Sequence, residues 1–194
     1  FGDRRIIANP NCSTIQMLVA LKPIYDAVGI TRVNVATYQA VSGAGKRAIE
    51  SLATQTAKLL NAQPIDNDVF PQQIAFNALP CIGDFQENGY TDEEMKMVWE
   101  TQKIFEDDDI LVNPTCVRIP VFYGHSEAVH IETREPISAE KAKDLLASAA
   151  GVEVIDETAD PDFPTPVRDA AGTAPVFVGR IREDITSKRG LNLW

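Results

Sequence analysis

Hydrophobic residues recur along the chain in two spacings, one typical of amphipathic helices and one typical of strands. The helical spacing predicts helices from just after Cys12 to near Gly29, from the turn at 42–46 to about Asn61, from Thr91 to about Phe105, and over 138–149. The strand spacing predicts strands over 30–41, 110–121 with an interruption near Pro114, 127–133, 152–155 and 176–181, with a further strand at 191–193.

Helices and strands alternate early in the chain, whereas strands follow one another late. This order favours an α+β fold over a strict βαβ repetition. Residues 62–90 contain several prolines and glycines and are predicted to form a long loop. No internal repeat or domain boundary is visible in the sequence, so residues 1–194 are expected to form a single domain.

Composition and charge narrow the class of protein. The 194 residues are 44% hydrophobic and 24% charged, which is ordinary for a globular domain. The net charge of −10 disfavours nucleic acid as a partner. No apolar run is long enough to predict a membrane span. The chain starts at Phe1 and stops inside a predicted strand, so we expect it to be a piece of a longer protein.

The three cysteines, Cys12, Cys81 and Cys116, form no close pair, and their number is odd. This pattern argues against a disulfide framework and predicts a cytoplasmic location. No Cys-x-x-Cys occurs, and the two histidines, His125 and His130, lie five residues apart. On a strand that separation directs them to opposite faces, so no metal site is predicted.

Cys12 has the sequence context of a nucleophile. It lies in the run Asn9-Pro10-Asn11-Cys12-Ser13-Thr14, directly before a predicted helix. Unpaired backbone N–H groups and the positive end of the helix dipole favour a thiolate at such a position. The alternative is that Cys12 is a small buried residue where the helix packs.

The glycine-rich run Ser42-Gly43-Ala44-Gly45-Lys46 joins a predicted strand to a predicted helix. It lacks the first glycine and the final Ser or Thr of a nucleotide P-loop, so a P-loop is excluded. Two interpretations remain: free backbone N–H groups of 43–45 that line a site, or a tight strand-to-helix turn.

Arg118 and His125 lie in a second segment with candidate chemistry, Cys116–Glu127. Arg118 is flanked by Val117 and Ile119, so its charge falls on a strand that otherwise reads as buried. A buried guanidinium needs a partner, which is either a protein carboxylate or a substrate carboxylate. His125 lies in a Gly-His-Ser turn, from which it can project into a cleft and act as a base for an activated cysteine.

Three segments, Asn9–Gln16, Tyr38–Gly45 and Arg118–His125, resemble the aspartate-β-semialdehyde dehydrogenase family. They occur in the order found in that family and together are highly specific. The resemblance identifies residues 1–194 as a catalytic and dimerisation domain. It implies an α+β fold with a mixed, mostly antiparallel sheet and helices on one face, like the C-terminal domain of glyceraldehyde-3-phosphate dehydrogenase.

The resemblance also implies a catalytic mechanism. Cys12 matches the nucleophile, Gln39 a glutamine that contacts the substrate, and His125 the general acid/base. The implied reaction reduces β-aspartyl phosphate to aspartate-β-semialdehyde with NADPH, through a thioester on Cys12, in the biosynthesis of lysine, threonine and methionine.

The remaining matches imply binding roles. Arg118 matches the arginine that binds the substrate α-carboxylate, and Asn11 the asparagine beside the nucleophile. Glu93 and Lys96 match residues that bind the substrate amine and the phosphate. Ser42 and Gly43 are expected near the cofactor, and the domain is expected to form a homodimer.

The chain departs from the family pattern in one respect. The Gly-x-Gly-x-x-Gly fingerprint of a nucleotide-binding domain is absent, so the main NADP site is missing and the fragment is not expected to turn over by itself. Three alternatives remain open: another acyl-phosphate reductase such as N-acetyl-glutamyl-phosphate reductase, a thiol hydrolase, and a non-catalytic dimerisation module. Glu93 argues against the first, because a free substrate amine requires a carboxylate.

Overall fold

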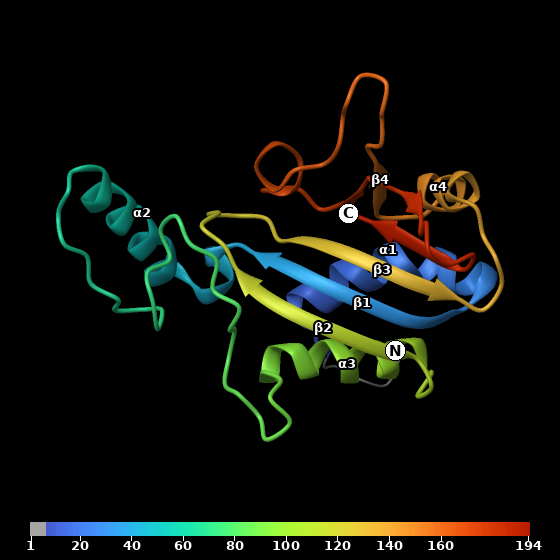
Figure 1. The fold of residues 1–194 in the computed structure, drawn as a ribbon, viewed down its shortest axis with the longest axis horizontal. Coiled ribbons are helices and arrows are strands. Elements are labelled where there is room, and N and C mark those ends of the chain that lie inside the picture. Colours follow the sequence, from blue (N-terminus) through green and yellow to red (C-terminus); the bar gives the residue numbers. More distant parts are fainter. Residues whose placement is uncertain (1–6) are drawn as a thin grey trace.

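A computed structural model describes residues 7–194, which form a five-stranded sheet with helices packed against it (Figure 1). The helical elements are α1 (Cys12–Val28), the 3-10 turn η1 (Val41–Ala44), α2 (Lys46–Leu60), α3 (Asp92–Phe105), α4 (Ala139–Ala147) and the π turn η2 (Pro166–Ala170). The strands are β1 (Ile30–Gln39), β2 (Leu111–Arg118), β3 (Ser126–Thr133), β4 (Val152–Val154), β5 (Val176–Val178), β6 (Arg182–Glu183) and β7 (Gly190–Leu193).

The strand order of the main sheet is β2-β1-β3-β7-β6. β1 and β2 are parallel, whereas the pairings of β1 with β3, β3 with β7 and β7 with β6 are antiparallel. β4 and β5 form a separate parallel pair. The predicted α+β fold with a mixed, mostly antiparallel sheet is therefore confirmed.

The helices that pack on the sheet cover one of its faces. Along β1, Val33 and Val35 are buried, while Asn34 and Ala36 between them are half-buried. Because strand side chains alternate between faces, the buried positions mark the side on which α1 and α3 pack. In Figure 1 the strands β1, β2 and β3 lie in front and α1 passes behind them, so no helix of residues 7–194 lies on the near face.

Helix α1 starts and stops where the sequence predicts. The Asn11 side-chain oxygen accepts hydrogen bonds from the N–H groups of Ser13 and Thr14, at 3.0 and 3.2 Å. Asn11 therefore caps the helix, and Cys12 is its first residue. The helix ends at Gly29, whose φ of 68° is left-handed. This tight reversal lets β1 start at the next residue.

The structure corrects three strand predictions. β2 runs through Pro114 without interruption, because β2 is an edge strand of the sheet and can lack one N–H. The strand predicted over 110–121 ends at Arg118. The strand predicted over 176–181 ends at Val178, since the next residue, Gly179, pairs its backbone with Trp194 instead of continuing beside β4.

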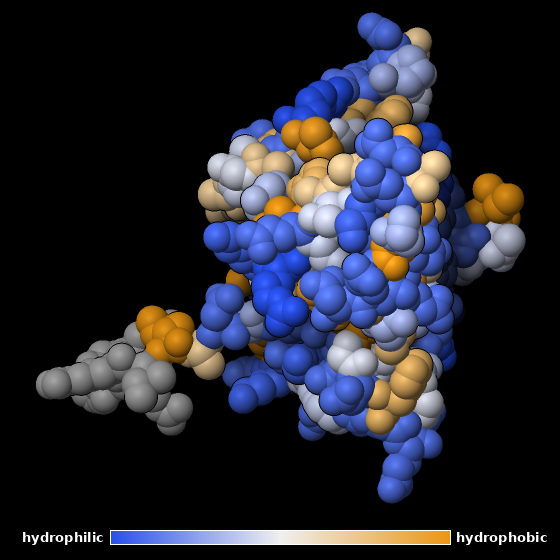
Figure 2. Space-filling model, turned by 90° about the vertical axis from the view of Figure 1, so that its left-hand side faces the viewer, coloured by the Kyte–Doolittle hydropathy of each residue, from blue (hydrophilic) through white to orange (hydrophobic). Residues whose placement is uncertain are grey.

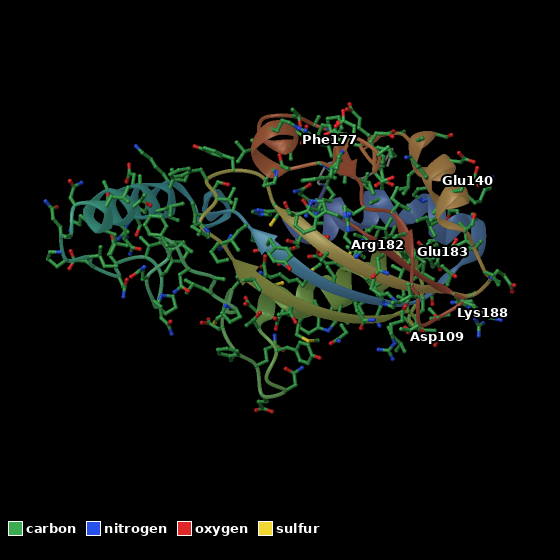
Figure 3. All side chains as sticks on the ribbon, turned by 45° about the horizontal axis from the view of Figure 1, so that its top comes forward. Asp109, Glu140, Phe177, Arg182, Glu183 and Lys188 are labelled. Carbon is green, nitrogen blue, oxygen red and sulfur yellow. The ribbon has the colours of Figure 1, made fainter. Side chains whose placement is uncertain are left out.

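The two ends of the molecule differ in character. At the end shown on the left of Figure 1, α2 and the 61–79 segment extend from the sheet and enclose a small apolar cluster around Leu52 and Ile74. The surface facing the viewer in Figure 2, which includes this end, is mainly hydrophilic, with isolated hydrophobic side chains. At the opposite end, the short edge strand β6 exposes Arg182 and Glu183 (Figure 3), and charged edges of this kind oppose pairing with another sheet.

Candidate active site

The sheet topology brings the predicted site residues to one end of the sheet. β1 and β2 are parallel, so Gln39 and Arg118 end the two strands side by side and pair in register. β3 is antiparallel to β1, so His125 immediately before β3 lies at the same end. The first turn of α1 lies at this end as well, as shown by the hydrogen bond that Gln39 Nε2 donates to Ser13 Oγ.

Cys12 is exposed at the N-terminus of α1, as expected for a nucleophile and unlike a packed core residue. Its pKa is nevertheless raised, mainly because of partial desolvation and then because of the nearby Glu93 carboxylate. The N–H groups of Ser13 and Cys12 and the charge of Arg118 lower the pKa but do not outweigh these causes. The helix N-terminus therefore favours the thiolate as predicted, but its effect on the pKa is smaller than the combined effect of burial and Glu93.

Ala40, directly after β1, holds both Arg118 and His125 through its backbone. Its carbonyl accepts a hydrogen bond from Arg118 Nη1 at 2.8 Å, and its N–H donates to His125 Nδ1 at 3.0 Å. Ala40 is fully buried. The relative position of the two side chains is thus set by the main chain of a rigid strand end.

Arg118 is only 7% exposed, and burial lowers its pKa. Within residues 7–194, no carboxylate oxygen lies within 4.0 Å of its guanidinium, although Glu93 and the Cys12 thiolate favour its charge from farther away. Of the two partners considered for Arg118, a protein carboxylate is therefore excluded within residues 7–194. A buried guanidinium with only a backbone carbonyl as its acceptor is suited to bind an external carboxylate.

His125 lines the same cavity as Cys12, but within the described part of the chain the two side chains share no hydrogen bond. Burial and the adjacent Arg118 charge lower the pKa of His125 to about 4, and Glu93 opposes this shift. His125 is therefore neutral at neutral pH.

Gln39 and Glu93 are also brought together. Gln39 is fully buried, and its Nε2 lies 3.4 Å from Glu93 Oε1. Gln39 Oε1 is buried and has no hydrogen-bond partner among residues 7–194. The Glu93 charge raises the pKa values of Cys12, Arg118 and His125, which places one carboxylate within electrostatic reach of all three groups.

Lys96 and Asn11 have partners within the protein. Lys96 Nζ lies 3.6 Å from Glu93 Oε2 and 3.7 Å from Asp92 Oδ2, and its side chain is 45% exposed. Asn11 uses its side-chain oxygen as the helix cap and its N–H to reach Glu100 at 2.7 Å. The side-chain NH2 group of Asn11 is what remains for a ligand.

The glycine-rich turn does not present free N–H groups at its glycines. The N–H of Gly43 donates to Ala40 and that of Gly45 to Ser42, so at these two glycines the structure agrees with the tight strand-to-helix turn, the second of the two interpretations. Gly43 is needed for a different reason: a Cβ there would lie 3.1 Å from Arg118 Nη1 and 3.2 Å from His125 Nε2. The turn lets Arg118 and His125 approach the backbone.

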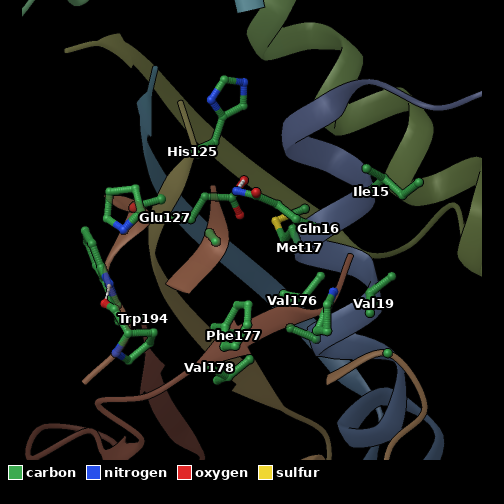
Figure 4. Close-up of a pocket in the computed structure, with 18 of the residues that line it drawn as sticks. Ile15, Gln16, Met17, Val19, His125, Glu127, Val176, Phe177, Val178 and Trp194 are labelled. Carbon is green, nitrogen blue, oxygen red and sulfur yellow. Dashed lines mark hydrogen bonds between the residues drawn. The ribbon is translucent and has the colours of Figure 1, made fainter. Parts of the chain in front are cut away.

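A cavity of about 470 Å³ opens beside Cys12 and His125 (Figure 4). Its walls come from α1, the start of β3, η2, β5 and Trp194. One polar residue that lines this cavity, Glu127, is not among the site residues predicted from the sequence. Glu127 is buried, accepts a hydrogen bond from Gln16 Nε2 at 2.7 Å, and has its pKa raised to about 8 by burial.

The sequence does contain a signal for Glu127. Side chains alternate between the two faces of a strand, so Glu127 lies on the same face of β3 as the inward-facing Val129 and Ile131, and this alternation alone predicts a buried carboxylate. Among residues 7–194, no group of His, Cys, Asp and Glu side chains is arranged to hold a metal ion. In the same range, no helix is both long enough and apolar enough to cross a bilayer.

Comparison with known proteins gives a consistent result. Residues 21–194 match the family described as semialdehyde dehydrogenase, dimerisation domain. Aspartate-semialdehyde dehydrogenase 2 of Vibrio cholerae is 66% identical over 194 residues, which are 100% of this chain and 57% of that protein. The chain therefore spans a little over half the length of this curated relative.

Solved structures agree with this match. The crystal structure of aspartate semialdehyde dehydrogenase II from Vibrio cholerae, complexed with ASA, superposes with a TM-score of 0.96 at 65% identity, covering 100% of this chain and 57% of that one. Aspartate semialdehyde dehydrogenase with NADP from Candida albicans superposes with a TM-score of 0.66 at 26% identity, covering 97% and 51%.

Proposed function

Because this chain belongs to the semialdehyde dehydrogenase dimerisation-domain family, we propose that residues 1–194 are the catalytic and dimerisation domain of an aspartate-semialdehyde dehydrogenase. The proposed reaction is the NADPH-dependent reduction of β-aspartyl phosphate to aspartate-β-semialdehyde and phosphate, in the biosynthesis of lysine, threonine and methionine. The observation that carries the proposal is Arg118, a buried cation with no carboxylate from residues 7–194 within 4.0 Å, beside an exposed cysteine and a neutral histidine.

The substrate has three charged groups, and the site offers a counterpart for each. Arg118 binds the α-carboxylate, for which a planar guanidinium can supply two parallel N–H groups. Glu93 binds the ammonium group, and its contact with Gln39 fixes the carboxylate beside the reacting centre. Lys96, 45% exposed at the rim, contributes a cation for the phosphate. Asn11 supplies its side-chain NH2 group next to Cys12.

Cys12 is the proposed nucleophile. Its thiolate attacks the acyl carbon, phosphate leaves, and a thioester forms. The raised pKa of the thiol depends in part on the free Glu93 charge. When the substrate ammonium pairs with Glu93, this repulsion is neutralised, so substrate binding favours the thiolate that reacts with it.

The residues present fit the edge of a nicotinamide cofactor site rather than its main part. Ser42 is half-buried and Gly43 exposed, and Gly43 lies against the His125 ring, which lines the cavity. These two residues would contact the cofactor, which supplies the hydride when bound. The chain itself contains no Gly-x-Gly-x-x-Gly motif to hold the rest of a dinucleotide.

The helix-free face of the sheet is the proposed homodimer interface. It carries half-buried residues such as Ala36 and Ala128, which lie directly opposite each other on β1 and β3. A series of hydrogen bonds crosses the same face from Asn113 to Asn34 to His130 to Asp184. A face whose polar groups are hydrogen-bonded to one another is suited to pack on a second copy. We also propose a cytoplasmic location, which three unpaired cysteines support.

The proposal is tested with the full-length protein that contains this chain. Purified enzyme should form NADPH from aspartate-β-semialdehyde, NADP and phosphate, and Cys12→Ser should abolish this activity. Glu93→Gln should raise the KM for aspartate-β-semialdehyde, because it removes the partner of the substrate ammonium. Activity with N-acetyl-glutamate semialdehyde instead, or acyl hydrolysis without any cofactor, would contradict the proposal.

A further inference from the structure

Glu127 is a buried carboxyl group that has no role in the proposed reaction. Its side chain lines the cavity beside Cys12 and His125, yet Glu127 is only 7% exposed. Burial of a carboxyl group costs free energy unless the group is hydrogen-bonded or keeps its proton. Burial raises the pKa of Glu127 to about 8, and among residues 7–194 the group that opposes this shift is the Gln16 side chain. At neutral pH, Glu127 is therefore a neutral hydrogen-bonding group.

The side-chain hydrogen bond of Glu127 joins β3 to α1. Gln16 Nε2 donates to Glu127 Oε1 at 2.7 Å, and Figure 4 shows the two side chains meeting at the cavity wall near His125. Gln16 lies four residues after Cys12, so the two lie one turn apart on the same side of α1. Because Glu127 lies near the start of β3, the bond connects the turn of α1 that follows Cys12 to the beginning of this strand.

Hydrogen bonds to three neighbouring elements hold the start of α1. Gln39 at the end of β1 donates to Ser13 Oγ, and the N–H of Asn11 donates to Glu100 of α3 at 2.7 Å. Among residues 7–194, the bond to Glu127 joins α1 to β3. The rest of the boundary between α1 and β3 is apolar core. Hydrophobic contact is non-directional, so it permits small sliding movements of the helix, which a hydrogen bond opposes.

From these contacts, we propose that Glu127 and Gln16 form a positioning pair, which holds the first turns of α1 against β3 and so places Cys12 for the reaction. This inference rests on the proposed function. The Cys12 side chain makes no hydrogen bond within residues 7–194, so its position depends on the helix that carries it. A misplacement of about 1 Å can cost roughly a hundredfold in rate. The pair acts through the placement of Cys12 and not through contact with the substrate.

The chemistry of the pair predicts which substitutions it tolerates. Gln16 supplies the donor of this bond and Glu127 the acceptor, so Glu127→Gln keeps a carbonyl acceptor with the shape of the neutral acid. Glu127→Leu has a similar volume but no acceptor, and it leaves the Gln16 amide without its partner. The double variant Gln16→Leu/Glu127→Leu removes both polar groups. Replacement of both partners by apolar groups can leave stability nearly unchanged.

Kinetics of the full-length enzyme provide the first test. At neutral pH we expect Glu127→Leu and Gln16→Leu each to lower kcat at least about tenfold, because α1 and Cys12 can shift. The double variant should be no worse than either single variant, since all three lose the same bond. The KM for aspartate-β-semialdehyde should stay within about twofold, since Arg118 and Glu93 are unchanged, and Glu127→Gln should keep at least about half of the wild-type kcat.

Ile131→Val is the matched control for a general loosening of β3. Ile131 is fully buried on the same face of β3 as Glu127, but its apolar side chain makes no hydrogen bond to α1. This variant should lower Tm and leave kcat nearly unchanged, whereas the double leucine variant should keep its Tm and lose kcat. An equal loss of kcat in Ile131→Val, or wild-type kcat in the double variant, would overturn the inference.

Hydrogen–deuterium exchange of the same full-length proteins tests the pair without an activity assay. The backbone amides of residues 15–18 should exchange faster in the double leucine variant than in wild type, and at the wild-type rate in Ile131→Val. If the wild-type enzyme does not act on aspartate-β-semialdehyde, the proposed function fails, whereas exchange still reports whether the pair holds α1. If the enzyme is active, a change in only one of exchange and kcat, or in neither, overturns the inference alone.

Discussion

Arg118 is a permanent charge inside the fold whose only hydrogen-bond acceptor in the described chain is the Ala40 carbonyl. Burial of an unpaired charge destabilises a protein, so such a charge is retained only where function requires it. A substrate carboxylate would explain why the fold tolerates the free-energy cost of burying Arg118, because the guanidinium gains its carboxylate partner when the substrate binds.

Arg118→Lys in the full-length enzyme should lower kcat/KM by about ten- to a hundredfold, although the charge is kept. Lysine cannot present two parallel N–H groups, and a hydrogen bond to a charged group is worth about 1.5–3 kcal/mol. The melting temperature should change little, since no protein carboxylate loses a partner. A large drop in Tm with near-normal kcat/KM would remove Arg118 from the substrate site.

The three cysteines should react in an order set by their surroundings. Cys12 is exposed although its pKa is raised, whereas Cys81 is partly buried, and Cys116 is fully buried with its pKa raised to about 12 by desolvation, so accessibility sets the order. Limited alkylation with iodoacetamide near pH 7.5 (about one unit below the pKa of a free thiol), followed by peptide mapping, should therefore label Cys12 first. Labelling of Cys81 or Cys116 at an equal rate would contradict its assignment as the nucleophile.

Glu127 should make stability depend on pH. Its folded pKa of about 8 lies above the unfolded value, so the folded state holds the proton more tightly. This stabilisation is complete below about pH 4 and is lost as the pH rises through 8. Glu127→Gln keeps an acceptor for Gln16 and cannot ionise.

Melting curves of wild type and Glu127→Gln test this dependence. Near pH 8.5 the variant should unfold at least about 2 °C higher, which corresponds to roughly 1 kcal/mol in a chain of this size. The difference should shrink toward about pH 5, where Glu127 is protonated in the folded state. Parallel curves across this range would show that Glu127 is not the titrating group.

At the scale of elements, the turn η1 connects the end of β1 to α2 and also shapes the site. Gly43 and Gly45 lie two residues apart in this turn but are required for different reasons. Gly43 makes room for Arg118 and His125, whereas Gly45 has a φ of 89° and no atom within 4 Å of its missing Cβ.

This contrast gives a matched pair of variants. Gly43→Ala should lower kcat/KM at least about tenfold with little effect on Tm, because Arg118 and His125 must shift by a few tenths of an ångström and a small misplacement of reacting groups is costly. Gly45→Ala should lower the free energy of unfolding by about 1 kcal/mol, from its left-handed backbone, with a smaller effect on kcat/KM. If the two variants behave alike, the contact of Gly43 with the site has no catalytic importance.

At the scale of the whole molecule, helices cover one face of the sheet and leave the other open. The chain should form a homodimer of two 21.3 kDa subunits at micromolar concentration, with this open face at the interface. Ala128→Glu places a charge in the centre of that face and should produce monomers in sedimentation velocity. Ala147→Glu, on the exposed side of α4, is the control and should remain dimeric. A monomeric wild type, or dimeric Ala128→Glu, would contradict the proposed interface.

Most of the local structure, and the candidate reactive groups, could be predicted from the sequence. Asn11, Gly29 and the Thr91–Glu94 capping box mark helix ends through short-range hydrogen bonds and backbone angles, which depend on neighbouring residues only. The same holds for Cys12, since a helix N-terminus is recognisable from a few residues. Pro114 was misjudged because tolerance of proline depends on whether a strand lies at an edge, a property of the sheet.

The pKa shifts and hydrogen-bond partners of the reactive groups, in contrast, depend on the tertiary structure. The pKa of Cys12 is raised although its helix position lowers it, because desolvation and Glu93, which is far away in sequence, contribute more. His125 accepts its hydrogen bond from the Ala40 N–H, 85 residues away along the chain. Desolvation and charge interactions act through space, so no local pattern contains them. The sequence identifies which groups react, whereas the fold determines their protonation and partners.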